Sequence, residues 1–184
     1  MYIAQEKEQS NIAEYVIYMF QLEDMVRAHS FDIEKIRQYI IQPQVKSESL
    51  EKEAVKWYSD IISEMKSRGL ERKGHLHRLG EVITEIIYLH NTLQDVVEDK
   101  KYLQLWESAS PNIEAFRSKS DLKDNHPVEV CFQALYMKLL LRLQKKDVNA
   151  ESEQAFDSMR ILLAYLTKGY HEMKAGNMEM FEKN

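Results

Sequence analysis

Residues 130–143 read VCFQALYMKLLLRL and form the longest apolar stretch of this 184-residue chain. Only Gln133, Lys138 and Arg142 interrupt it, so apolar side chains would cover nearly the whole circumference of a helix. A helix that is apolar on all sides is typical of a protein interior. We therefore predict a helix over 128–146 at the centre of the fold. The stretch is too short and too charged to span a bilayer, so we expect no membrane association.

The segments on either side of this stretch carry their apolar residues on one face. These residues recur at steps of three and four, the period of an amphipathic helix, and no long run alternates with the period of two that marks a strand. The chain has only five glycines and three prolines to interrupt helices. The predicted helices cover residues 10–29, 32–41, 48–68, 75–98, 111–119, 128–146 and 150–174. The expected fold class is all-α: a single antiparallel helical bundle of about five main helices plus short helices.

Capping residues mark where several of these helices begin. Asp32, Ser47 and Asn149 have short polar side chains that can accept a hydrogen bond from the free N–H groups of a first helical turn. Ser110 before Pro111 is typical of a cap followed by a first helical residue, because proline lacks an N–H that would be unpaired there anyway. We therefore predict a helix that starts at Pro111.

The composition limits the class of protein. With 44% hydrophobic and 30% charged residues, the chain is neither disordered nor membrane-like. A net charge of −5 argues against a protein that coats nucleic acid without specificity. The one cysteine, Cys131, lies in the apolar stretch, so we expect a buried thiol and no disulfide. The N-terminus does not read as a secretion signal, and we expect a cytoplasmic protein.

The length suits one domain, which we place at residues 1–174, with a C-terminal tail at residues 175–184. Met178, Met180 and Phe181 lie in this tail, where apolar side chains need a surface to cover them. The tail could fold back on its own subunit or dock on a second copy. Nine methionines in the chain also suit adaptable interfaces.

The clearest departure from the acidic average is the segment 66–78, KSRGLERKGHLHR. We expect this segment to form a helix end, a loop and the start of the next helix. Such a segment can bind an anion, because free backbone N–H groups and basic side chains converge in it. The candidate anion-binding residues are Lys66, Arg68, Arg72, Lys73, His75, His77 and Arg78. The competing interpretation is a solvated loop whose charges balance the dipole of the preceding helix.

Within this segment, Arg72 and His77 resemble the short arginine–histidine motif of the HEPN-type helical ribonucleases. The resemblance implies metal-free cleavage of a phosphodiester, in which the arginine stabilises charge on the phosphate and the histidine moves protons. It covers six residues only. Lys73 and Gly74 depart from the family pattern and put the resemblance in doubt.

A metal-binding or small-molecule-binding bundle is a further alternative. His77, Glu81 and Glu85 are spaced four residues apart, so they share one face of a helix. Bundles that bind two iron atoms need Glu-x-x-His pairs, and the sequence contains none. We expect an exposed face with hydrogen bonds along the helix, no metal site and no cofactor.

The first predicted helix contains several polar side chains among its apolar ones: Glu14, Tyr15, Tyr18, Glu23, Asp24 and Arg27. Glu23 and Arg27 have the spacing and order of a surface ion pair. The alternative is a polar groove between this helix and a neighbour, lined by Tyr15 and Tyr18.

The same helix, NIAEYVIYMFQLEDMVRA at residues 11–28, resembles an uncharacterised bacterial family catalogued only as a domain of unknown function. The resemblance extends over nearly the whole chain. It implies a helical fold and brings no activity or site residues.

Because the sequence carries no catalytic signature, the leading interpretation is a non-enzymatic interaction or scaffold protein. The methionine-rich helices and the apolar tail favour a homodimer, with a protein partner possible. The second interpretation is a phosphate-binding or nucleic-acid-binding protein that uses residues 66–78. The third is a bundle that binds a small molecule or a metal.

Overall fold

The computed structural model describes residues 1–177, and these residues form helices and no strand. The elements are α1 (Tyr2–Ser10), α2 (Ile12–Ala28), α3 (Ile33–Ile36), η1 (Arg37–Ile41), α4 (Glu48–Ser67), α5 (His77–Asn91), η2 (Thr92–Val96), α6 (Lys100–Ser118), α7 (Pro127–Leu143) and α8 (Ala150–Lys174). The prediction of an all-α fold is confirmed.

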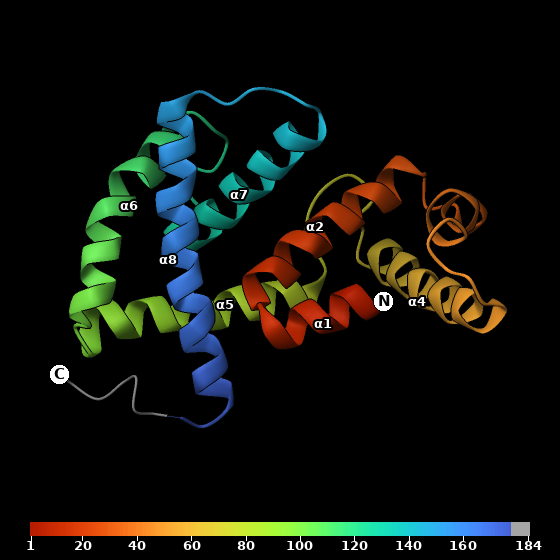
Figure 1. Ribbon diagram of the computed structural model, residues 1–184, viewed down its shortest axis with the longest axis horizontal. Helices are drawn as coiled ribbons and strands as arrows, with labels where there is room; N and C mark the ends of the chain where they lie inside the picture. The colour runs from red at the N-terminus through yellow and green to blue at the C-terminus, as the bar shows by residue number, and fades with distance from the viewer. Residues whose placement is uncertain (178–184) are drawn as a thin grey trace.

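The helices pack less regularly than the predicted antiparallel bundle (Figure 1). Helices α6 and α8 lie side by side, whereas α5 runs steeply across them. Helix α2 contacts α1, α7 and α8. Helices α3 and α4, together with η1, form the end of the molecule that lies farthest from α6 (Figure 1).

Helix α7 lies against four other helices: α2, α5, α6 and α8. Its first half is enclosed, since Val130, Cys131, Phe132 and Ala134 have no exposed surface. Burying a side chain such as Val or Phe contributes about 1.5–3 kcal/mol. This half of the helix therefore anchors the C-terminal part of the core.

The predicted caps at Asp32, Ser47 and Asn149 are present. Asp32 accepts hydrogen bonds from the N–H groups of the first turn of α3, and Ser47 accepts one from the first turn of α4. Asn149 does the same at the start of α8. These interactions are local in sequence, which is why the pattern of residues predicted them.

The predicted helix over 10–29 is present as α2, but the separate helix α1 that precedes it was not predicted. Asn11 adopts an extended conformation that ends α1 and caps α2. Helix α1 buries only Ala4, so its sequence carries no apolar stripe. Residues with good helix propensity form it instead.

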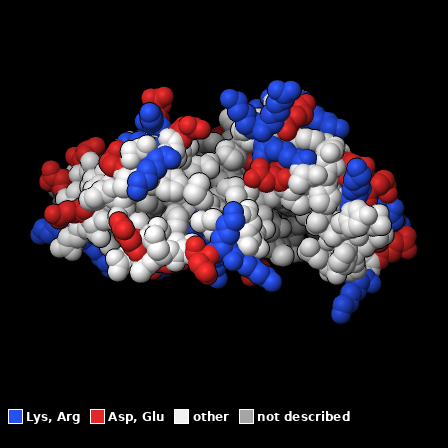
Figure 2. Space-filling view, turned by 90° about the horizontal axis from the view of Figure 1, so that it is seen from above, with Lys and Arg blue, Asp and Glu red and all other residues white. Residues whose placement is uncertain are grey.

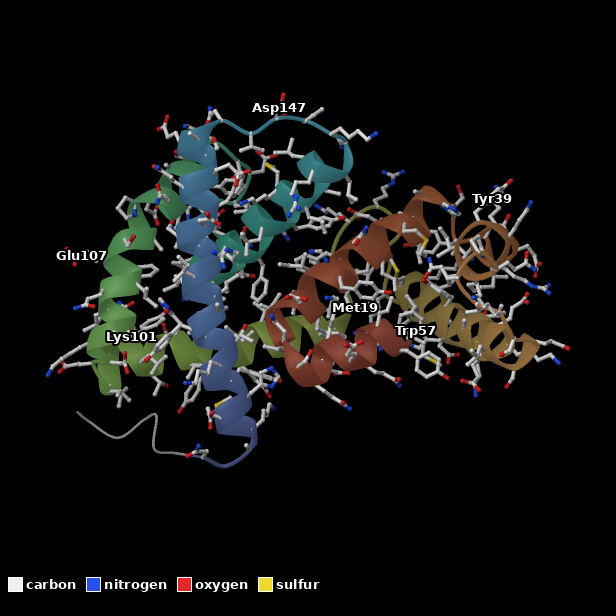
Figure 3. The ribbon with its side chains drawn as sticks, in the orientation of Figure 1. Met19, Tyr39, Trp57, Lys101, Glu107 and Asp147 are labelled. Carbon is white, nitrogen blue, oxygen red and sulfur yellow. The ribbon has the colours of Figure 1, made fainter. Side chains whose placement is uncertain are left out.

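The predicted helix start at Pro111 is also wrong. Helix α6 begins at Lys100, and Pro111 lies inside it. The cap is Asp99, whose carboxylate accepts a hydrogen bond from the Tyr102 N–H. Proline inside a helix leaves the carbonyl four residues earlier without its partner. That residue is Glu107, on the exposed side of α6 (Figure 3), where water can take the bond.

One set of buried residues runs from Ala4 to Tyr170 and links all the long helices. Within residues 1–177, no helix is both long enough and apolar enough to cross a membrane. The tail residues Met178, Met180 and Phe181, whose docking the sequence suggested, lie outside the described residues.

Candidate functional site

The basic segment 66–78 forms the last turns of α4, a loop and the start of α5. Two of its arginines turn to one carboxylate: Arg68 and Arg78 lie 3.6 and 3.8 Å from Glu64 oxygens. Lys66 lies over the ring of Phe31, 5.8 Å from its centroid. These three cations therefore face groups of the protein and do not converge on a common anion site.

Arg72, Lys73 and His77 are exposed. His77 faces Glu81 on its own helix, with Nδ1 3.9 Å from the carboxylate. Within residues 1–177, no hydrogen bond or ion pair joins Arg72 to His77, so the geometry adds nothing to the ribonuclease resemblance. Figure 2 shows Lys and Arg interspersed with Asp and Glu over the face seen from above. A mixed surface of this kind is typical of solvated protein surfaces.

His75 points inward, unlike the exposed residues Arg72, Lys73 and His77. Its Nδ1 lies 2.6 Å from Glu23 Oε2, and the Leu76 N–H donates to Glu23 Oε1 at 2.8 Å. Glu23 has no exposed surface. The His75 ring stacks on Phe20 at 3.8 Å, and its Nε2 lies 3.2 Å from Gln133 Nε2. Both ring nitrogens therefore have partners, which suits fastening of the loop better than proton transfer to a ligand.

Arg27 fastens the same loop from the other side. Its guanidinium donates to the carbonyl oxygens of Leu70 and Gly74 and to the carboxylate of Asp24. The predicted pair of Glu23 with Arg27 is thus wrong, because Arg27 pairs with Asp24 and Glu23 turns into the core. Asp24 also accepts a hydrogen bond from the Tyr136 hydroxyl at 2.6 Å. Together these contacts tie the loop to α2 and α7.

A second group of polar rings lies between α5, α6 and α7. The Tyr102 hydroxyl is hydrogen-bonded to Nδ1 of His90. The His90 ring packs edge-on against Trp106 at 4.9 Å and His126 at 5.2 Å. Burial, together with the neighbouring His126, lowers the pKa of His90 to about 4. Burial also raises the pKa of the Cys131 thiol to about 12, so this cysteine is a protonated core residue.

The alternative of a metal-binding bundle has no candidate site among residues 1–177. No group of three or more His, Cys, Asp or Glu residues is placed there to hold an ion. Of the three residues that share a face of α5, His77 faces Glu81, whereas Glu85 pairs with Lys174 of α8 at 2.7 Å.

The second half of α7 differs from its enclosed first half. Met137 is 45% exposed and Leu143 is 57% exposed, and the leucines at 139–141 are half-buried. A groove of about 450 Å³ lies on the side of α2 and α8, and one of about 360 Å³ lies on the side of α6 and the Asp147 loop (Figure 3). The sequence suggested a helix buried on all sides, and only the first half fits that description.

The sequence suggested a polar groove lined by Tyr15 and Tyr18 beside the first long helix, and only Tyr18 lies at a groove there. Tyr18 lines a groove of about 220 Å³ between α1, α2, η1 and α4. Tyr15 is only 5% exposed and belongs to the core. The groove is largely apolar, because Glu23, Asp24 and Arg27 lie at the other end of α2. The other tyrosines of the groove are Tyr2 of α1 and Tyr58 of α4, which apolar spacing alone could not place there.

A comparison with models of protein families matches residues 1–177 to a family described as Domain of unknown function (DUF4924). No curated protein matches the chain. No solved structure matches it either. Any assignment of function therefore depends on the geometry of the chain itself.

Proposed function

Since the chain belongs to the DUF4924 family, whose description names no activity, we propose that it is a non-enzymatic interaction protein that forms a homodimer through the second half of α7. The observation that carries this proposal is the exposed apolar surface of Met137–Leu143. Exposed apolar side chains gathered on one helix mark interaction surfaces more often than singly scattered ones do.

The two grooves beside this half of α7 make the surface concave on both sides of the helix. Leu135, Leu139 and Leu163 contribute to the wider groove, and Met137 and Leu141 contribute to the narrower one. A partner side chain can enter such a depression and be enclosed, which is how a few residues come to dominate binding energy.

The charges around the wider groove have both signs. Lys138 pairs with Glu153 at 2.5 Å, and Arg160 pairs with Asp157 at 3.1 Å. Arg142 has no carboxylate within ion-pair distance among residues 1–177. A twofold axis brings the same patch of two subunits together, so a patch with apolar surface and both signs of charge can complement itself. A second copy of the chain is therefore the partner that this surface suits.

The test is the mass of the full chain in solution, by native mass spectrometry and light scattering. We expect wild type to be a dimer and the double variant Met137→Glu, Leu143→Glu to dissociate with a Kd raised at least about tenfold. Both positions are exposed, so the variant should fold normally. Val96→Glu, at a site that is 63% exposed but distant in the chain, is the matched control. A monomeric wild type, or a dimer that the double variant leaves intact, contradicts the proposal.

A further inference from the structure

Helix α7 begins with a histidine as its cap. The Nδ1 atom of His126 accepts a hydrogen bond from the Val128 N–H at 3.2 Å, and the Glu129 carboxylate accepts one from the His126 N–H at 2.7 Å. Among residues 1–177, the other helix caps whose side chains accept a hydrogen bond are Asn11, Asp32, Ser47, Asp99 and Asn149. Their oxygen atoms remain acceptors in mildly acid solution, whereas a histidine nitrogen that binds a proton does not.

The cap requires a neutral His126 ring. A backbone N–H can only donate, so the Nδ1 atom that accepts from Val128 must carry a lone pair and no proton. In a histidinium both ring nitrogens carry protons, and Nδ1 would then oppose the Val128 N–H. Protonation therefore removes the cap, and it also adds a positive charge at the end of the helix where the dipole disfavours one.

The groups around His126 on balance oppose its protonation. Burial is the main cause that lowers the pKa of His126, and the Arg117 guanidinium of α6 lowers it as well, whereas the Glu129 carboxylate acts in the opposite direction. The His90 ring of α5 packs edge-on against His126 at 5.2 Å. Asp95 of η2 raises the pKa of His90, but burial and His126 outweigh this effect. A proton on His126 thus meets one carboxylate and two basic neighbours.

The turn that His126 caps closes one side of the core. Val128 and Val130 of this turn are buried, and α7 packs here between α5 and α6. The first N–H groups of a helix have no partner within the helix, so they depend on the cap. Without it, the turn can open while the remaining helices stay packed, because local opening costs less than global unfolding.

We propose that His126 is a pH-sensitive cap, and that protonation of its Nδ1 releases the first turn of α7 from α5 and α6 in mildly acid solution. This device lies in the enclosed first half of α7 and does not depend on the dimer surface in the second half.

The lowered pKa of His126 sets the direction of the effect. This pKa lies below 6.5 while the turn is closed, and it returns towards 6.5 when the turn opens. The open state therefore binds more protons in this range. Opening increases as the pH falls below 6.5, and the cap holds the turn closed above it.

The test is hydrogen exchange of the full chain, measured by mass spectrometry on residues 126–133 at pH 7.5 and pH 5. Each rate is divided by the rate of the chain unfolded in urea at the same pH, which removes the direct effect of pH on exchange. In wild type, we expect the relative rate to be about fivefold higher at pH 5, since this is the effect of losing one cap on a helix start.

Two variants separate the titrating cap from a merely structural one. His126→Asn keeps an acceptor that does not titrate, so it should lose most of the pH dependence while its first turn stays protected. His126→Ala has no acceptor, so residues 126–133 should exchange about fivefold faster than in wild type already at pH 7.5, with little further change at pH 5. Circular dichroism confirms that each variant is folded.

The start of α8 is the internal control, because Asn149 caps it by accepting from the Ser152 N–H at 2.8 Å and does not titrate. Residues 149–156 report any general loss of stability at pH 5, and they should change much less than residues 126–133. Equal pH dependence of residues 126–133 in wild type and His126→Asn overturns the proposal. An equal change at the starts of α7 and α8 in wild type overturns it too.

Discussion

His75 and His90 both lie at helix interfaces, and both have a hydrogen bond and an aromatic neighbour, yet their surroundings differ. His75 faces the carboxylate of Glu23, stacks on Phe20, and keeps one-third of its side chain exposed. His90 faces a phenol and a second histidine and is 4% exposed. The first histidine pairs with a buried carboxyl group, whereas burial holds the second one neutral. The same residue type thus fastens a loop in one region and fills an apolar core in the other.

The largest effect should follow from removing the buried carboxyl group that His75 faces. Glu23→Ala removes the acceptor of both the His75 ring and the Leu76 N–H, and it leaves a space in the core. We expect the free energy of unfolding to fall by about 3 kcal/mol, because the buried Leu76 N–H loses its acceptor and a cavity remains. Urea denaturation followed by circular dichroism measures the change.

The matched control is Glu81→Ala. Glu81 also faces a histidine, but at 3.9 Å and with two-thirds of its side chain exposed. Exposed pairs contribute about 0–1 kcal/mol, so this variant should unfold nearly as wild type does. If Glu23→Ala costs no more than Glu81→Ala, the buried carboxylate does not hold the loop.

The contrast between the histidines shows what sequence could and could not predict about the site. The basic segment could be recognised from its sequence, but Glu23, the partner of His75, lies 52 residues away in the chain. Glu23 looked like a surface residue because Arg27 follows four positions later. Glu23 turns inward to meet His75, whose ring packs on Phe20 and lies beside Gln133 of α7. No spacing along α2 reveals these contacts.

The fold was more predictable where the determinants are local. The caps at Ser47 and Asn149 and the long stripes of α4 and α8 follow from neighbouring residues. Helix α1 lacks an apolar stripe and was not predicted. Pro111 resembled a helix start, so the start of α6 was predicted too late in the chain. The apolar stretch predicted burial for all of α7, although composition cannot tell which half the neighbouring helices cover.

The next effect concerns the pH dependence that the neutral His90 gives to stability. Burial lowers the pKa of His90 from 6.5 to about 4, with His126 adding to the shift and Asp95 opposing it. Between these pH values the unfolded chain binds more protons than the folded chain. The free energy of unfolding therefore rises with pH, by up to about 1.4 kcal/mol per pH unit for one group. This stability is present above pH 6.5 and is lost as the pH falls through 4.

Denaturation of wild type and His90→Gln at several pH values between 4 and 7.5 tests this effect. Glutamine cannot titrate, so the variant should show a shallower slope than wild type across the window. His126 and the other titrating groups remain in both proteins, and their contributions largely cancel in the difference. Parallel slopes for the two proteins would show that His90 is not the group that resists protonation.

The smallest effect concerns the hydrogen bond that holds His90 in place. Burial keeps the Tyr102 hydroxyl protonated, and this hydroxyl is hydrogen-bonded to Nδ1 of His90. Tyr102→Phe removes the hydrogen-bond partner of that nitrogen, at a position where Tyr102 has no exposed surface. We expect a loss of about 1 kcal/mol in the free energy of unfolding, against no measurable loss for Tyr88→Phe, whose ring is 67% exposed. A loss as large as that of Glu23→Ala would mean that the cluster around His90 is as sensitive to a missing partner as the cluster around His75. The two histidines would then differ only in their exposure.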